Sequence, residues 1–133
     1  MSNKLVKIGI DLDETITYCT KFFSLMTNAM KDVAEIHIIT NREQTAENEI
    51  NIRNELNELG IFYNHLGITG DKAEYILKNG ITVYFDDTDE YFIDLPESVR
   101  VFKIREPWNF DFKKHLWNYD DRTGQNIDNT QWT

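Results

Sequence analysis

Apolar stretches alternate with segments of helical periodicity over most of the chain. Stretches typical of buried strands occupy residues 5–10, 36–40, 61–66, 81–85 and 99–104. Between them, apolar side chains recur three or four positions apart, which predicts helices over residues 22–33, 41–59 and 71–79. Strands that alternate with helices indicate an α/β fold, with a doubly wound parallel sheet and helices on both of its faces.

Small polar residues and glycines mark the ends of the expected helices. Thr20 is placed to cap the start of the first helix, and Gly60 to end the second. Asp71 precedes the third helix, with Glu74 three residues further on and Gly80 after the last turn. These signals predict three separate helices.

Two carboxylates stand at the end of the first apolar stretch. Asp11 and Asp13 follow residues 8–10, and side chains two positions apart on a strand point to the same face. A carboxylate leaves water at a high cost unless it is paired or bound to a cation, and two that lie close together usually need a metal ion or a shared proton. We therefore expect a functional site here.

Other polar side chains follow later strands. Thr40 closes the second apolar stretch, and Asp86 and Asp87 directly follow the fourth. In doubly wound sheets, ligands bind beyond the carboxyl ends of the strands, near the reversal of strand order. These residues are therefore expected at the same edge of the sheet as Asp11 and Asp13.

Length and composition are those of one globular domain over residues 1–133. The chain shows no signal peptide, and no apolar run approaches the roughly 18 residues of a membrane span, so we expect a cytoplasmic protein without a membrane partner. The net charge of −9 argues against nonspecific binding to nucleic acid. Cys19 is the one cysteine and is expected to be a reduced thiol.

The segment 105–133 differs from the rest of the chain. It is polar but carries six scattered aromatic residues, Trp108, Phe110, Phe112, Trp117, Tyr119 and Trp132. One interpretation is a tail that packs on the domain through these aromatics, with about the last ten residues disordered. The other is a surface for a substrate or a second subunit.

The sequence resembles the haloacid dehalogenase superfamily of phosphotransferases over roughly residues 5–90. Four motifs of that superfamily occur in order, each after the expected kind of element: Asp11-Leu12-Asp13-Glu14-Thr15 (D-x-D-x-T), Thr40, Lys72 in the first turn of a helix, and Asp86-Asp87. The resemblance implies a Rossmann-like core and a phosphatase that acts on phosphate monoesters.

The resemblance also implies a covalent mechanism. Asp11 would attack phosphorus and form an aspartyl-phosphate, while Asp13 would act as general acid and then general base. Thr40 and the backbone amide of Asn41 would bind the phosphoryl oxygens, and Lys72 would offset their charge.

A hard cation is needed to bring the anionic nucleophile to an anionic substrate, and Mg²⁺ prefers oxygen ligands. The resemblance implies a Mg²⁺ site formed by Asp11, the backbone carbonyl of Asp13, and Asp86 or Asp87. Response-regulator receiver domains also combine an acidic pair with Thr and Lys, but there the acidic pair is adjacent and comes first. Here the adjacent pair, Asp86-Asp87, comes last.

The spacing between motifs leaves no room for the cap domain of many superfamily members. About 25 residues separate Thr15 from Thr40, and about 32 separate Thr40 from Lys72. We expect an open site, covered by a large substrate such as a phosphoprotein or polynucleotide end, or by a neighbouring subunit in a homo-oligomer. A small phosphorylated substrate, a metabolite or nucleotide, is the other class.

One detail favours a nucleotide. The segment Arg105-Glu106-Pro107-Trp108-Asn109 resembles a segment of bacterial nucleotidase-like members, which implies that Trp108 stacks on a base and Arg105 meets a phosphate. The sequence is also compatible with two alternatives to a phosphatase. One is a catalytically silent binding module with the same fold; the other is a phosphate-transferring or dehalogenating enzyme, although Asp13 disfavours dehalogenation.

The three histidines are not expected at the site. His37 lies in the middle of a strand and is expected in the core, and His65 and His115 show no metal-ligand spacing.

Overall fold

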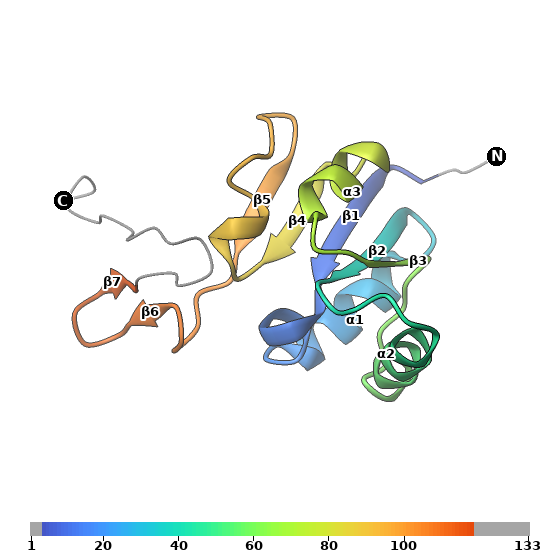
Figure 1. Ribbon diagram of the computed structural model, residues 1–133, viewed down its shortest axis with the longest axis horizontal. Helices are drawn as coiled ribbons and strands as arrows, with labels where there is room; N and C mark the ends of the chain where they lie inside the picture. Colours follow the sequence, from blue (N-terminus) through green and yellow to red (C-terminus); the bar gives the residue numbers. More distant parts are fainter. Residues whose placement is uncertain (1–3, 119–133) are drawn as a thin grey trace.

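The computed structural model describes residues 4–118 and contains a five-stranded parallel sheet (Figure 1). The strands run in the order β3-β2-β1-β4-β5. Their bounds are Val6–Asp11 for β1, Ala34–Thr40 for β2, His65–Ile68 for β3, Val83–Asp86 for β4 and Arg100–Lys103 for β5. The chain therefore adds strands on one side of β1 and then returns to add two on the other, which confirms the expected parallel α/β architecture.

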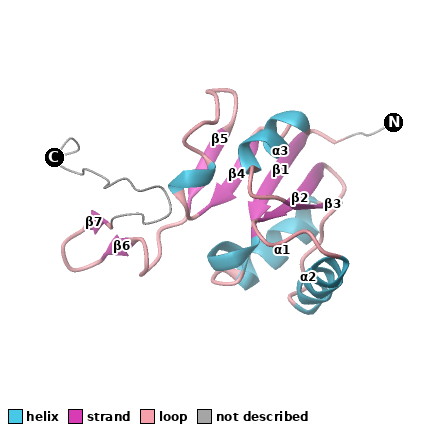
Figure 2. Cartoon of the chain, in the orientation of Figure 1, coloured by secondary structure: helices cyan, strands magenta, loops and turns pink. Residues whose placement is uncertain are grey.

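Three helices cover the sheet (Figure 2): α1 (Thr20–Met30), α2 (Ala46–Glu58) and α3 (Lys72–Lys78). Phe23 of α1 and Ile52 of α2 pack in one core cluster with apolar side chains of β1 and β2. Ile76 of α3 packs in a second cluster with Ile39 and Tyr84. Two separate cores place helices on both faces of the sheet. No helix within residues 4–118 combines the length and apolar character that a membrane crossing requires.

The helix ends agree only in part with the expected signals. The Asp71 side chain accepts a hydrogen bond from the Glu74 amide at 3.1 Å, as a cap should. Gly60 and Gly80 adopt positive φ values of 72° and 68° just beyond α2 and α3, a conformation that glycine adopts without strain. The expected cap at Thr20 is wrong, because Thr20 is the first helical residue and its hydroxyl donates to the Ile16 carbonyl.

Two expected elements have different bounds. The helix expected from residue 41 begins at Ala46, because Thr45 caps it by accepting from the Asn48 amide and residues 41–45 form a loop. The strand expected at 61–66 lies at His65–Ile68, where it pairs with β2. Helix α1 also exposes Phe22 and Leu25, two of the apolar residues whose spacing predicts a helix over residues 22–33.

Beyond β5 the chain forms a small antiparallel hairpin of β6 (Phe110–Asp111) and β7 (Leu116–Trp117). The buried Asn109 side chain links this hairpin to the sheet, because its amide donates to the carbonyls of Asp87 and Ile104. The expected aromatic contacts of Tyr119 and Trp132 lie outside the described residues.

Candidate active site

Polar side chains converge where the three central strands end. Asp11 is the last residue of β1, Thr40 of β2 and Asp86 of β4, and these strands are neighbours in the sheet (Figure 1). All three side chains belong to buried residues. The expected convergence of Asp11, Thr40 and Asp86 at one edge is therefore present.

Lys72 lies between two of these carboxylates. It comes from the first turn of α3, is only 2% exposed, and its Nζ is 2.6 Å from Asp11 Oδ1 and 3.3 Å from Asp86 Oδ2. The ammonium also lies 4.1 Å from the centre of the Tyr91 ring, at a distance typical of a cation–π contact. Most lysines in the first turn of a helix are solvated, but Lys72 is a buried cation beside Asp11, the expected nucleophile.

Burial and mutual charge interactions shift the pKa values of Asp11, Asp86 and Lys72. The pKa of Asp11 lies well above its ordinary value because burial and then the charge of Asp86 disfavour its ionised form, against the opposing effect of Lys72. Burial likewise raises the pKa of Asp86 to about 6, although Lys72 and the Tyr84 hydroxyl stabilise its ionised form. Burial alone would lower the pKa of Lys72, but Asp86 and Asp11 outweigh burial and raise it.

Backbone and hydroxyl donors fix the carboxylates in place. Asp86 Oδ1 accepts from the amides of Asp87 and Thr88 at 2.7 and 3.0 Å. The Thr15 hydroxyl donates to Asp11 Oδ2 at 3.0 Å, which gives the last position of the D-x-D-x-T motif a structural contact. Each carboxylate therefore has a defined orientation toward Lys72.

Three carboxylates could hold a metal ion. Asp11, Asp86 and Asp87 each offer one oxygen, and these oxygens lie within 4.8 Å of one another. An all-oxygen donor set of this kind fits a hard cation such as Mg²⁺, which prefers carboxylates and retained water. The residues present therefore fit the expected type of cation, and the Asp13 carboxylate is not part of the cluster.

Asp13 instead faces Arg42, which the sequence analysis did not identify. Arg42 Nη2 is 2.6 Å from Asp13 Oδ1 and Nε is 3.2 Å from Oδ2, and Nη1 bonds Glu55 on α2 at 3.2 Å. The Thr40 hydroxyl lies 3.4 Å from Asp13 Oδ2. Thr40 and Asp13 are thus brought together, with the Asp13 side chain about half exposed.

A small hollow of about 70 Å³ lies over the cluster. Its lining comes from the ends of the central strands and the segments after them: Asp11, Asp13, Asn41, Lys72, Thr88 and Tyr91. The Asn41 side-chain amide donates to the Tyr91 hydroxyl at 2.7 Å. The hollow has room for a few water-sized groups and is walled by both signs of charge.

The two expected substrate contacts lie beside a larger hollow. A space of about 890 Å³ is lined by Thr17, Tyr18, Cys19, Arg105, Glu106, Pro107 and Trp108. The Trp108 indole N–H donates to Asp87 Oδ2 at 2.7 Å, so this hollow adjoins the acidic cluster. The Arg105 guanidinium lies 4.8 Å from the Phe110 ring centre and 5.0 Å from that of Phe112.

Glu106 is a further acidic group that the sequence analysis did not identify. It is 4% exposed, and neither carboxylate oxygen has a hydrogen-bond partner among the described residues. Its carboxylate lies close to those of Glu14 and Asp87, with one oxygen of each within 4.8 Å of the others. Burial, followed by the charges of Asp87 and Glu14, raises the pKa of Glu106 to about 8. The one feature of the sequence that could have indicated a role for Glu106 is its position between Arg105 and Trp108 in the nucleotidase-like segment.

Comparisons with known proteins add no family assignment. No protein-family model matches the chain, and a search of curated proteins found no match. The case for a function therefore depends on the geometry of the site.

Proposed function

We propose that the protein is a Mg²⁺-dependent phosphomonoester hydrolase of the haloacid dehalogenase type, acting through an aspartyl-phosphate at Asp11. The observation that supports this most strongly is the buried contact of 2.6 Å between Lys72 Nζ and Asp11 Oδ1, beside the carboxylates of Asp86 and Asp87. A buried lysine next to a strand-end carboxylate supplies a fixed positive charge where a phosphoryl group would be transferred.

In the first proposed step, an Asp11 carboxylate oxygen forms a bond to phosphorus as the bond from phosphorus to the ester oxygen breaks. The Asp13 carboxyl group gives its proton to the departing oxygen. Lys72 balances the negative charge on the phosphoryl oxygens, and the Thr40 hydroxyl donates to one of them. The products of this step are the free alcohol and phospho-Asp11.

In the second step, a water oxygen attacks phosphorus and the Asp13 carboxylate takes the proton of that water. The bond from phosphorus to the Asp11 oxygen breaks, so inorganic phosphate leaves and both aspartates return to their starting states. Mg²⁺, held by Asp11, Asp86 or Asp87 and the Asp13 carbonyl, would reduce the repulsion between the anionic nucleophile and the anionic substrate.

The larger hollow supports a nucleotide as substrate. It adjoins Asp87 through Trp108 and is lined by Tyr18, Pro107 and Trp108, which are flat or apolar groups suited to a base. The phosphate would then occupy the small hollow over Asp11 and Lys72. A phosphorylated macromolecule end is the alternative that the open edge also accommodates.

The central experiment is hydrolysis of p-nitrophenyl phosphate, with and without Mg²⁺, by the wild-type chain and Asp11→Asn. We expect Mg²⁺-dependent hydrolysis by the wild type and loss of turnover in the variant. Asp32→Asn is the matched control, because Asp32 is exposed and the charge change is the same. Retained turnover in folded Asp11→Asn would contradict the proposal. If the wild type hydrolyses p-nitrophenyl phosphate, a screen of nucleotides, phosphorylated metabolites and 3′-phosphorylated oligonucleotides identifies its substrate class.

A further inference from the structure

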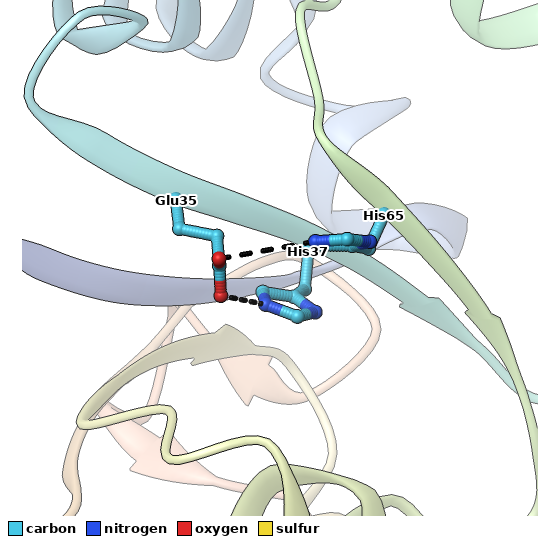
Figure 3. Close-up of side chains that lie close together, drawn as sticks. All are labelled: Glu35, His37 and His65. Carbon is cyan, nitrogen blue, oxygen red and sulfur yellow. Dashed lines mark hydrogen bonds and ion pairs between the residues drawn. The ribbon is translucent and has the colours of Figure 1, made fainter. Parts of the chain in front are cut away.

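Two histidines and a glutamate gather on neighbouring strands, apart from the residues of the proposed active site (Figure 3). Glu35 and His37 lie two positions apart on β2 and therefore share a face of the sheet. His65 on β3 is paired in register with His37. The sheet thus assembles the three side chains, although His65 is far from the other two in sequence.

The distances between their polar atoms are short. Glu35 Oε2 is 2.8 Å from His37 Nε2, and Glu35 Oε1 is 3.8 Å from His65 Nε2. The two imidazole rings lie with their centres 4.7 Å apart. Figure 3 shows the Glu35 carboxylate beside the two rings, with one oxygen directed toward each of them.

Tyr75 fixes the orientation of His37. Its hydroxyl lies 2.8 Å from His37 Nδ1, on the opposite side of the ring from Glu35. At 2.8 Å, the His37 Nε2–H donates to the Glu35 carboxylate when the proton is on Nε2. When the proton is on Nδ1, that nitrogen donates to Tyr75, and the lone pair of Nε2 becomes available to a cation placed between it and Glu35.

The donor set is that of a zinc site. Zn²⁺ binds imidazole nitrogens and carboxylates, and tetrahedral bonds of about 2.0–2.1 Å hold donor atoms roughly 3.4 Å apart. The separations of 2.8 and 3.8 Å lie on either side of this value, and the ligand atoms of the two rings lie within 4.8 Å of each other. Side-chain rotations would have to bring all three donor atoms to the tetrahedral spacing. The His65 side chain is 55% exposed, which leaves access for water as a further ligand.

We propose that Glu35, His37 and His65 bind a Zn²⁺ ion that links the edge strand β3 to β2. In this arrangement Tyr75 is a positioning residue, because its hydroxyl bonds the His37 ring nitrogen that does not bind the ion. Lys7 opposes Zn²⁺ binding, because its ammonium lies 3.8 Å from Glu35 Oε2 and its positive charge would repel the ion. The site is independent of the proposed phosphatase activity.

The test is a calorimetric titration of Zn²⁺ into the chelator-treated, untagged chain carrying Cys19→Ser, which removes the thiol. Excess Mg²⁺ is present to saturate the carboxylates around Asp11. We expect one Zn²⁺ per chain, with affinity reduced about 10–100-fold or more by His65→Asn and by Glu35→Gln, and about 10-fold by Tyr75→Phe. Lys7→Met should tighten binding.

His115→Asn is the matched control, because His115 is the remaining histidine and adopts a φ of 59° that asparagine tolerates. A second readout is thermal unfolding, in which Zn²⁺ should raise the midpoint of the wild type but not that of His65→Asn. Asp11→Asn should bind Zn²⁺ like the wild type. Absence of saturable binding, or equal binding by wild type, His65→Asn and Glu35→Gln, would overturn the inference.

Discussion

Arg42 donates hydrogen bonds to both carboxylate oxygens of Asp13, with Nη2 2.6 Å from Oδ1 and Nε 3.2 Å from Oδ2. A carboxyl group held in this way cannot at the same time point to the leaving oxygen of a substrate. For Asp13 to act as general acid in the proposed mechanism, the Arg42 guanidinium has to move away from it. Arg42 thus restrains the group on which the proton transfers of both proposed steps depend.

The first prediction concerns Arg42→Ala. Because the variant releases Asp13, we expect turnover of an alkyl phosphate, whose leaving group needs a proton, to rise relative to turnover of p-nitrophenyl phosphate. The free energy of unfolding should fall by less than about 1 kcal/mol, as for other partly exposed ion pairs. Steady-state kinetics with both substrates measures the ratio, and Arg53→Ala on α2 is the control. An equal fall with both substrates would instead assign Arg42 to substrate binding.

The second prediction concerns the buried lysine. Lys72→Met keeps the volume of the side chain but leaves Asp11 and Asp86 close together without the ammonium. Breaking a buried ion pair in this way should lower the free energy of unfolding by about 3–5 kcal/mol, measured by urea denaturation in EDTA. Lys78→Met in the last turn of the same helix should have little effect, because Lys78 is exposed.

Mg²⁺ provides a further check on the same variant. If the cluster of Asp11, Asp86 and Asp87 accepts a divalent cation, Mg²⁺ should stabilise Lys72→Met more than it stabilises the wild type, because the variant lacks the competing ammonium. An equal or smaller effect of Mg²⁺ on the variant would speak against a cation site at these carboxylates.

The third prediction follows from Glu106. Burial, with Asp87 and Glu14, raises its pKa to about 8 from an ordinary value of 4.5, so between these values the folded chain keeps a proton that the unfolded chain releases. The free energy of unfolding should therefore fall as the pH rises through this window, and this dependence should weaken in Glu106→Gln. Urea denaturation in EDTA at several pH values measures it, with exposed Glu97→Gln as the control. A pH dependence in Glu106→Gln that matches the wild type would show that Glu106 is already ionised.

The fourth prediction concerns Gly67 on β3. A Cβ at this position would lie 2.6 Å from Tyr75 Cε2, and the aromatic ring cannot yield as a flexible chain end would. We expect Gly67→Ala to lower the free energy of unfolding by about 1–3 kcal/mol. Gly70→Ala is the comparison, because a Cβ there meets only the end of the Asn41 side chain, at 3.2 Å. Wild-type stability in Gly67→Ala would show that Tyr75 has room to move.

Much of the fold follows from local pattern. Apolar strand segments gave the five parallel strands, and Asp71 and Gly80 marked the ends of α3 because capping depends on neighbouring residues alone. The existence of helix α1 was predicted, but its buried face was not, because that face includes Thr27. The Thr27 hydroxyl donates to the Phe23 carbonyl and accepts from the Phe62 amide. Hydropathy does not distinguish such a threonine from an exposed one.

The convergence of Asp11, Thr40 and Asp86 was also predictable, because parallel strands end at the same edge. The partners of these residues were not. Arg42 lies in a loop that was expected to be helical. The apolar pattern predicts that Tyr84 is buried in a strand, but not that its hydroxyl donates to Asp86. His65 acquires its neighbours only through the register of β3 against β2, which no local pattern contains.

The strand order also has a consequence for synthesis of the protein. β1 pairs on one side with β2 and on the other with β4, whose residues follow much later in the chain. A nascent chain that has made only β1, β2 and β3 would present the apolar edge of β1 at Ile8–Ile10 without a partner, and an open edge of this kind invites pairing with other chains. Chains that stall before β4 should therefore aggregate, while release of β4 from the ribosome would cover this edge of β1 and bring Asp86 to the acidic cluster in one event.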